Sequence, residues 1–132
     1  MTVVLTEIYK TFPNKAECVK HLEYLIWNNK PICPYCRSNK NSPSLKEKRY
    51  HCNNCNTTYS VTIGTIFHKT KVDLQKWYYV ISIVICTDIS ARQLAIDIGV
   101  TKDTACLMVK KAKRLFVENG KLFDQIQQSC KY

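Results

Sequence analysis

Two pairs of cysteines are the residues of this sequence best suited to chemistry. The motifs Cys-Pro-Tyr-Cys at 33–36 and Cys-Asn-Asn-Cys at 52–55 are separated by fifteen residues. Each tight turn brings two sulfurs close enough to share a metal ion, and two such turns complete a tetrahedral zinc site. We therefore predict that Cys33, Cys36, Cys52 and Cys55 bind one structural Zn²⁺ ion. Four thiolates leave no open position for a catalytic water.

Redox thiols or disulfides are the alternative interpretation of these cysteines. A redox-active cysteine pair would not need a second, matching pair about fifteen residues away, so the spacing favours zinc. His51, next to Cys52, is a minor competing ligand. The other four cysteines are scattered along the chain, at Cys18, Cys86, Cys106 and Cys130.

The cysteine pairs lie between two stretches with helical patterns. Asn14 and Glu17 resemble a capping box, and apolar residues at three-four spacing then predict a helix that ends near Asn28. Strands are expected over 46–52 and 57–63. The sequence predicts a mainly helical α+β fold, in which a small four-cysteine zinc ribbon of short antiparallel strands is flanked by an N-terminal helix and a C-terminal helical bundle. The predicted domains are the N-terminal helix (1–30), the ribbon (31–70) and a helical domain (71–132).

The helical domain contains a candidate helix-turn-helix. Asp73 can cap a buried helix over 74–85, and Ser90 with Gln93 begins another that Gly99 ends. Thr101 caps a longer helix that ends near residue 119. The last dozen residues are expected to fray or to pack against a partner. The inward stripe predicted for the longer helix is Ala105, Met108, Val109, Ala112, Leu115 and Phe116.

The charge balance favours a polyanionic partner. Twenty Lys and Arg face ten Asp and Glu, a net charge of +10. Anionic lipid, or solubility alone, would also explain this surplus. In a helix-turn-helix, the second helix reads base edges with its first residues and meets phosphates with later ones. The predicted nucleic-acid-binding residues of both modules are Arg37, Lys46, Lys48, Arg49, Lys69, Lys71, Arg92, Lys102, Thr104, Leu107, Lys110, Lys111 and Arg114.

No membrane or secretory segment is evident in the sequence. No apolar stretch reaches the roughly 18 residues that a spanning helix needs. Residues 1–10 lack a basic leader and a small-residue cleavage pattern. We therefore expect no membrane partner and a cytoplasmic protein, associated with the nucleoid if the host is bacterial.

Several further motifs accompany the two cysteine pairs: Tyr59-Ser60-Val61-Thr62, Gly64-Thr65-Ile66-Phe67, Lys76-Trp77 and Gln93-Leu94-Ala95. Together with the cysteine pairs, they resemble the N-terminal region of zinc-ribbon insertion-sequence transposases, over roughly Phe12 to Phe116. Two positions differ from the family pattern. Cys106 replaces an aromatic residue, and Arg37 replaces a glycine, so the first cysteine turn is expected to differ locally.

The resemblance implies sequence-specific binding of duplex DNA, at transposon ends, or as a repressor or accessory subunit. In that family a separate ribonuclease-H-like domain supplies the catalytic carboxylates, and this chain ends before it, so we expect no enzyme activity. The partners would be duplex DNA and a separate catalytic subunit or another protein, with the protein acting as a monomer or a homodimer. One alternative is a protein-interaction module that uses Trp77, Tyr78, Tyr79 and 122–126 as its surface. Another is an RNA or single-strand binder that uses exposed tyrosines.

Overall fold

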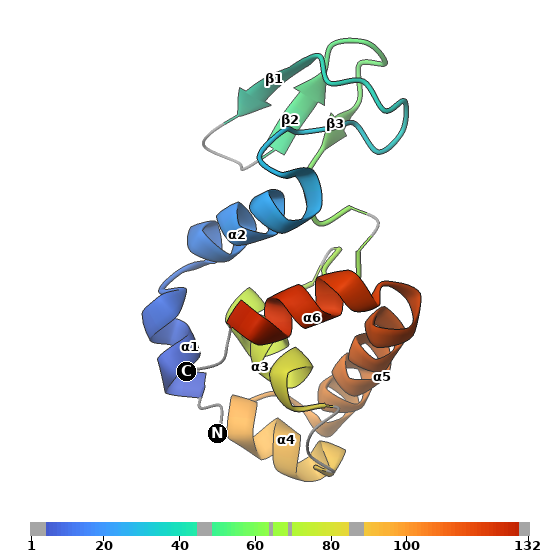
Figure 1. The fold of residues 1–132 in the computed structure, drawn as a ribbon. Coiled ribbons are helices and arrows are strands. Elements are labelled where there is room, and N and C mark those ends of the chain that lie inside the picture. Colours follow the sequence, from blue (N-terminus) through green and yellow to red (C-terminus); the bar gives the residue numbers. More distant parts are fainter. Residues whose placement is uncertain (1–4, 45–48, 64, 69, 85–88, 130–132) are drawn as a thin grey trace. The chain divides into compact units, whose positions relative to one another are not determined.

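The protein is mainly helical with one small sheet. The computed structural model describes residues 5–44, 49–63, 65–68, 70–84 and 89–129. The chain divides into two compact units, residues 15–70 (the ribbon unit) and residues 1–14 with 71–132 (the helical unit). The predicted N-terminal segment 1–30 is thus divided between them. The elements (Figure 1) are α1 (Leu5–Thr11), α2 (Lys15–Trp27), β1 (Asn41–Ser44), β2 (Arg49–Cys52), β3 (Thr58–Tyr59), α3 (Leu74–Ile83), α4 (Ala91–Ile98), α5 (Lys102–Glu118) and α6 (Gly120–Ser129).

The ribbon unit joins α2 to a three-stranded antiparallel sheet of order β1-β2-β3. Helix α2 begins directly after Asn14, and its end is followed by Asn28 and Asn29 at φ 52° and 62°, a left-handed conformation that stops a helix. Strand β2 covers the described end of the predicted strand 46–52, whose residues 46–48 lie outside the described part of the chain.

Two strand predictions need correction. The strand expected over 57–63 is only the two residues of β3, and the chain turns from Val61 onward. Strand β1, with the sequence Asn-Ser-Pro-Ser, was not predicted, because none of its residues favours a strand. It forms by pairing with β2, in a register that sets Asn41 opposite Cys52.

In the helical unit, α1 packs against α3 (Figure 1). The Gln75 side-chain amide donates to the carbonyl oxygen of Phe12 at 2.9 Å, and the Phe12 and Tyr78 rings meet edge to face at 5.1 Å. The prediction that the Asp73 side chain caps α3 is wrong. Asp73 occupies the N-cap position without a side-chain cap hydrogen bond, and its Oδ2 accepts one from the Tyr9 hydroxyl at 2.9 Å instead.

Helices α4 and α5 form the predicted helix, short turn and helix. The Ser90 hydroxyl accepts a hydrogen bond from the Gln93 backbone N–H at 3.1 Å, and the Thr101 hydroxyl accepts one from Thr104 N–H at 3.2 Å. Gly99 ends α4 at φ 71° and ψ 42°. Both caps and the glycine turn are therefore confirmed, and three residues connect the two helices.

Replacing Gly99 with alanine should destabilise the helical unit by about 1 kcal/mol, because a Cβ is unfavourable in the left-handed region. Chemical denaturation followed by circular dichroism would measure the change. The matched control is Gly120→Ala at the start of α6, where a Cβ meets nothing within 4 Å. An equal loss of stability in both variants would contradict the role assigned to the turn.

Helix α6 is part of the core. Leu122, Phe123 and Ile126 are 5%, 1% and 0% exposed, so the expectation that this segment frays or awaits a partner is wrong. Trp77 and Tyr78 are buried too, so most of the residues predicted to form the surface of a protein-interaction module are not exposed. Within the described residues, no helix is long and apolar enough to cross a bilayer.

The stripe predicted on α5 is mostly correct. Ala105, Met108, Ala112 and Leu115 are buried as expected. Phe116 is 43% exposed and lies at the edge of the core, where its ring meets Phe123 edge to face at 5.1 Å.

Candidate metal centre and nucleic-acid surface

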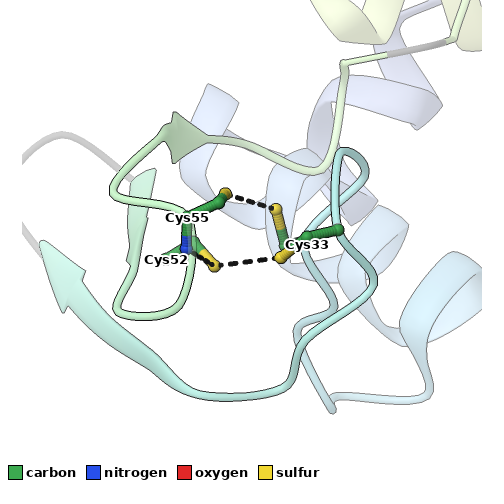
Figure 2. Close-up of side chains that lie close together, drawn as sticks. Cys33, Cys52 and Cys55 are labelled. Atoms are coloured by element: carbon green, nitrogen blue, oxygen red, sulfur yellow. Dashed lines mark hydrogen bonds between the residues drawn. The ribbon is translucent and has the colours of Figure 1, made fainter.

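The structure brings the four predicted cysteines together in the ribbon unit. Their Sγ atoms all lie within 4.8 Å of one another. Cys33 and Cys55 are 3.7 Å apart and Cys36 and Cys52 are 3.5 Å apart, far longer than a disulfide bond. Figure 2 shows the labelled thiols of Cys33, Cys52 and Cys55 pointing toward one another.

The sulfur geometry fits a single zinc ion. Zn–S bonds of about 2.3 Å in a tetrahedron place neighbouring sulfurs about 3.8 Å apart. The two measured separations, 3.7 and 3.5 Å, are close to that value. The donor set is four thiolates without a carboxylate or water position, so the ion that fits is one structural zinc.

His51 does not compete for the ion. Successive side chains on a strand point to opposite faces of the sheet, and on β2 the Cys52 side chain is buried while that of His51 is exposed. Among the described residues, the group able to hold a metal consists of the four cysteines.

The two cysteine turns have the same backbone structure. In the first turn, Cys33 N–H bonds to Ser38 O at 3.0 Å and Arg37 N–H to Cys33 O at 2.9 Å. In the second, Cys52 N–H bonds to Thr57 O at 2.8 Å and Asn56 N–H to Cys52 O at 2.9 Å. We call each of these segments, 33–38 and 52–57, a knuckle. Their repetition explains how two short sequence motifs build one site.

Arg37 and Asn56 occupy equivalent positions and are both left-handed, with φ of 62° and 60°. Asparagine is tolerated in this region, but for other non-glycine residues it costs roughly 1–2 kcal/mol. The first knuckle was expected to differ locally because it lacks a glycine. This expectation is wrong, since Arg37 adopts the conformation that glycine would favour.

Backbone and side-chain donors surround the sulfurs. The N–H groups of Tyr35 and Cys55 approach the sulfurs of Cys33 and Cys52 at 3.4 and 3.5 Å. The Asn54 side-chain amide lies 3.6 Å from the Cys36 sulfur and so ties the second knuckle to the first. Such N–H groups stabilise negative charge on thiolates, the form that binds zinc.

The thiols are not equally acidic when no metal is bound. Hydrogen bonds from the Ser38 backbone and then from the Asn54 side chain lower the pKa of the Cys36 thiol to about 6. The Cys55 backbone N–H lowers the pKa of Cys52, but burial and hydrogen bonds with Cys36 and Cys55 outweigh it and raise that pKa to about 11. Zinc must displace the remaining protons, so acid should weaken its binding.

Three aromatic rings support the metal centre. Trp27 from α2 meets Tyr50 and Tyr59 edge to face at 5.6 and 5.7 Å, and the two tyrosines stack at 5.7 Å. Tyr50 also donates a hydrogen bond to Glu23 of α2. Burial, and then this bond to a carboxylate, raise the pKa of Tyr50. These contacts join α2 to the sheet. The sequence did not predict this role for Trp27, which stands at the end of a helical pattern.

The predicted nucleic-acid residues fall into both units. Lys46, Lys48 and Lys69 lie outside the described residues. Two further members, Thr104 and Lys111, are only half exposed, and the Thr104 hydroxyl accepts a hydrogen bond from that of Thr101 at 2.8 Å. The remaining members are exposed: Arg37 and Arg49 in the ribbon unit, and Lys71, Arg92, Lys102, Leu107, Lys110 and Arg114 in the helical unit. Their contact with nucleic acid stays a prediction.

Comparison with known proteins agrees with this site. Residues 13–58, which include α2 and both knuckles, match the family model described as the transposase zinc-ribbon domain. The chain is also 30% identical over 108 residues to an uncharacterized protein in transposable element ISH50 of Halobacterium salinarum, an alignment that covers 80% of this chain. It spans 37% of that relative's length. No solved structure matches significantly. Residues 13–58 are thus similar to the zinc-ribbon domain of transposases.

Proposed function

We propose that this protein binds duplex DNA through the α4–α5 helix-turn-helix. The observation that carries the proposal is the exposed basic face of α5, a helix that follows a three-residue turn and is capped by Thr101. Lys102, Leu107, Lys110 and Arg114 are exposed on α5, whose buried residues lie on its other side. A helix of this kind can enter the major groove.

The charges on α5 support contact with phosphate. The helix carries five basic and two acidic side chains. Arg114 forms an ion pair with Glu118 at 3.7 Å, but both side chains are more than half exposed, so the pair is weak and easily exchanged for a phosphate. Leu107, 51% exposed among these charged residues, offers an apolar contact for base edges.

A role at transposable-element DNA is the finer part of the proposal. The similarity to a transposase zinc ribbon and to a protein in a transposable element supports recognition of element ends, by a repressor or by an accessory to a catalytic subunit. All of these roles require the same duplex-binding activity. The alternative of RNA or single-strand binding requires exposed tyrosines on which bases can stack. Tyr35 is exposed, but Tyr59 is buried and Tyr50 stacks on it within the ribbon, so this alternative is weaker than the sequence suggested.

Salt-dependent binding tests the proposal. Fluorescence anisotropy with labelled 30-base-pair duplexes between about 50 and 200 mM salt should show affinity falling steeply with salt. The double substitution Lys110→Ala, Arg114→Ala should reduce the slope of log affinity against log salt by about 2, because two phosphate contacts are lost. Competition with single strands and RNA should leave the duplex preferred.

The matched control is Lys10→Ala, Lys121→Ala. It removes the same charge from exposed positions on α1 and α6. Its salt slope should change little. Absence of duplex binding at low salt would refute the proposal. Equal losses in both double variants would mean that overall charge, and not α5, attracts the DNA.

A further inference from the structure

Each knuckle contributes one buried and one partly exposed cysteine to the metal centre. Cys33 and Cys52, the first cysteines of the two knuckles, are both 0% exposed. Cys36 and Cys55, the second cysteines, are partly exposed, and Cys36 is the more exposed of the two. A small reagent in the solvent therefore reaches Cys36 most easily, whereas the two buried cysteines are shielded from it.

The Cys36 sulfur lies close to a buried sulfur of the other knuckle. Its distance from the Cys52 sulfur is 3.5 Å, and the Asn54 side-chain amide donates to it at 3.6 Å. A disulfide requires an S–S distance of about 2.05 Å, whereas two sulfurs on one zinc ion are about 3.8 Å apart. A Cys36–Cys52 disulfide and a zinc ion held by all four cysteines therefore exclude each other.

Positive charge is placed unequally on the two knuckles. Arg37 follows Cys36 in the first knuckle, whereas the neutral Asn56 occupies the equivalent position in the second. Arg37 is exposed, and among the described residues no carboxylate forms an ion pair with it. Reactive cysteines are thiolates in partly exposed, electropositive surroundings. Because zinc binds cysteine as the thiolate, Cys36 has all three of these properties.

We propose that Cys36 is a site of reversible oxidation by peroxides, and that Cys52 completes the reaction and displaces zinc. The Cys36 thiolate attacks one oxygen of hydrogen peroxide, the O–O bond breaks, and hydroxide leaves a sulfenic acid behind. The Cys52 thiolate then attacks the Cys36 sulfur, so that an S–S bond forms and the S–O bond breaks with loss of a second hydroxide. Two protons from the solvent convert both hydroxides to water. The two sulfurs lose two electrons, which the peroxide gains.

This oxidation releases the metal. Zinc loses two of its four ligands, and the thiolates of Cys33 and Cys55 take up protons as the ion leaves. The ribbon unit thereby loses the ion that stabilises it. A thiol reductant regenerates the Cys36 and Cys52 thiolates, so zinc can bind again. The reaction requires the zinc site alone and is independent of duplex binding by α5, which lies in the helical unit.

Peptide mapping of the oxidised protein identifies the disulfide. The zinc-loaded full chain is treated with hydrogen peroxide, its remaining thiols are alkylated, and it is digested with trypsin. Cleavage after Arg37 and Arg49 places the two knuckles on separate peptides. The first product should join these peptides through Cys36 and Cys52, and a zinc-indicator dye should record release of the ion at the same rate. Dithiothreitol with added zinc should reverse both changes.

Arg37→Asn, which copies the residue of the second knuckle, tests the role of the charge. Zinc release by peroxide should become slower by about threefold, the scale expected of one exposed charge. The zinc affinity before oxidation should stay the same, because all four cysteines remain. The matched control is Lys20→Ala, which removes one exposed charge from α2 of the same unit and should leave the rate unchanged. Equal slowing in both variants would overturn the role of Arg37.

Three results would overturn the proposal as a whole. One is a first disulfide confined to a single knuckle, either Cys33–Cys36 or Cys52–Cys55, which leaves the two peptides separate. Another is irreversible oxidation of Cys36 to a sulfinic acid without any disulfide. The third is retention of zinc under conditions that already oxidise Cys106, a partly exposed thiol of α5 outside the metal centre.

Discussion

Removing zinc should unfold the ribbon unit and leave the helical unit folded. The sheet and knuckles have a small buried cluster at the metal centre, in which Cys33, Cys52 and Tyr59 are buried, with Trp27 and Tyr50 packed against them. Binding of zinc to such a site contributes about 10 kcal/mol or more to folding, far more than this cluster supplies. Either a chelator or Cys33→Ser should therefore abolish the ordered ribbon.

The two tryptophans report on the two units separately. Trp27 lies in the ribbon unit and Trp77 in the helical unit. Chelation of the zinc should move the NMR chemical shift of the Trp27 indole N–H to the value of an unfolded chain, whereas the shift of the Trp77 indole N–H should stay at its folded value. Cys106→Ser, which alters a cysteine of α5 outside the cluster, is the control and should retain one zinc per chain. A dispersed Trp27 signal in the metal-free protein would contradict the structural role of zinc.

Truncating Phe123 should have the second largest effect. Its ring is 1% exposed, meets Phe116 edge to face and belongs to α6, which packs on both α3 and α5. Phe123→Ala should destabilise the helical unit by about 3–5 kcal/mol, because the cavity cannot fill by small movements of the surrounding helices. Urea denaturation followed at the Trp77 resonance would measure the loss.

The matched control for Phe123 is Val117→Ala on α5. Val117 is 81% exposed, so its truncation should cost less than about 0.5 kcal/mol. If α6 served as a docking surface, as the protein-interaction alternative assumed for 122–126, Phe123→Ala would leave the isolated protein as stable as before and would affect only association. That outcome would overturn the assignment of α6 to the core.

Most helices could be predicted from the sequence because their ends depend on residues close to them along the chain. The side chains of Ser90 and Thr101 cap α4 and α5 within three residues of themselves, and Gly99 ends α4 through its own backbone freedom. The cysteine motifs are equally local, because each places its two sulfurs within one turn. The apolar pattern of α6 was visible too, but a pattern does not say which surface it covers.

The sequence by itself determined the zinc ligands, the mainly helical fold with its ribbon and the helix-turn-helix, because each cysteine pair, helix cap and glycine turn is formed by residues a few positions apart and the spacing of the two pairs is typical of a zinc ribbon. Tertiary structure decided the rest. Strand β1 forms only through its pairing with β2, and Phe123 is buried against other helices. The Asp73 side chain accepts a hydrogen bond from Tyr9 and does not cap α3. The tertiary structure also showed that Arg37 keeps a left-handed turn. These features depend on partners or hydrogen bonds that residue types alone do not specify, since the free energy lies in the contact and not in either segment.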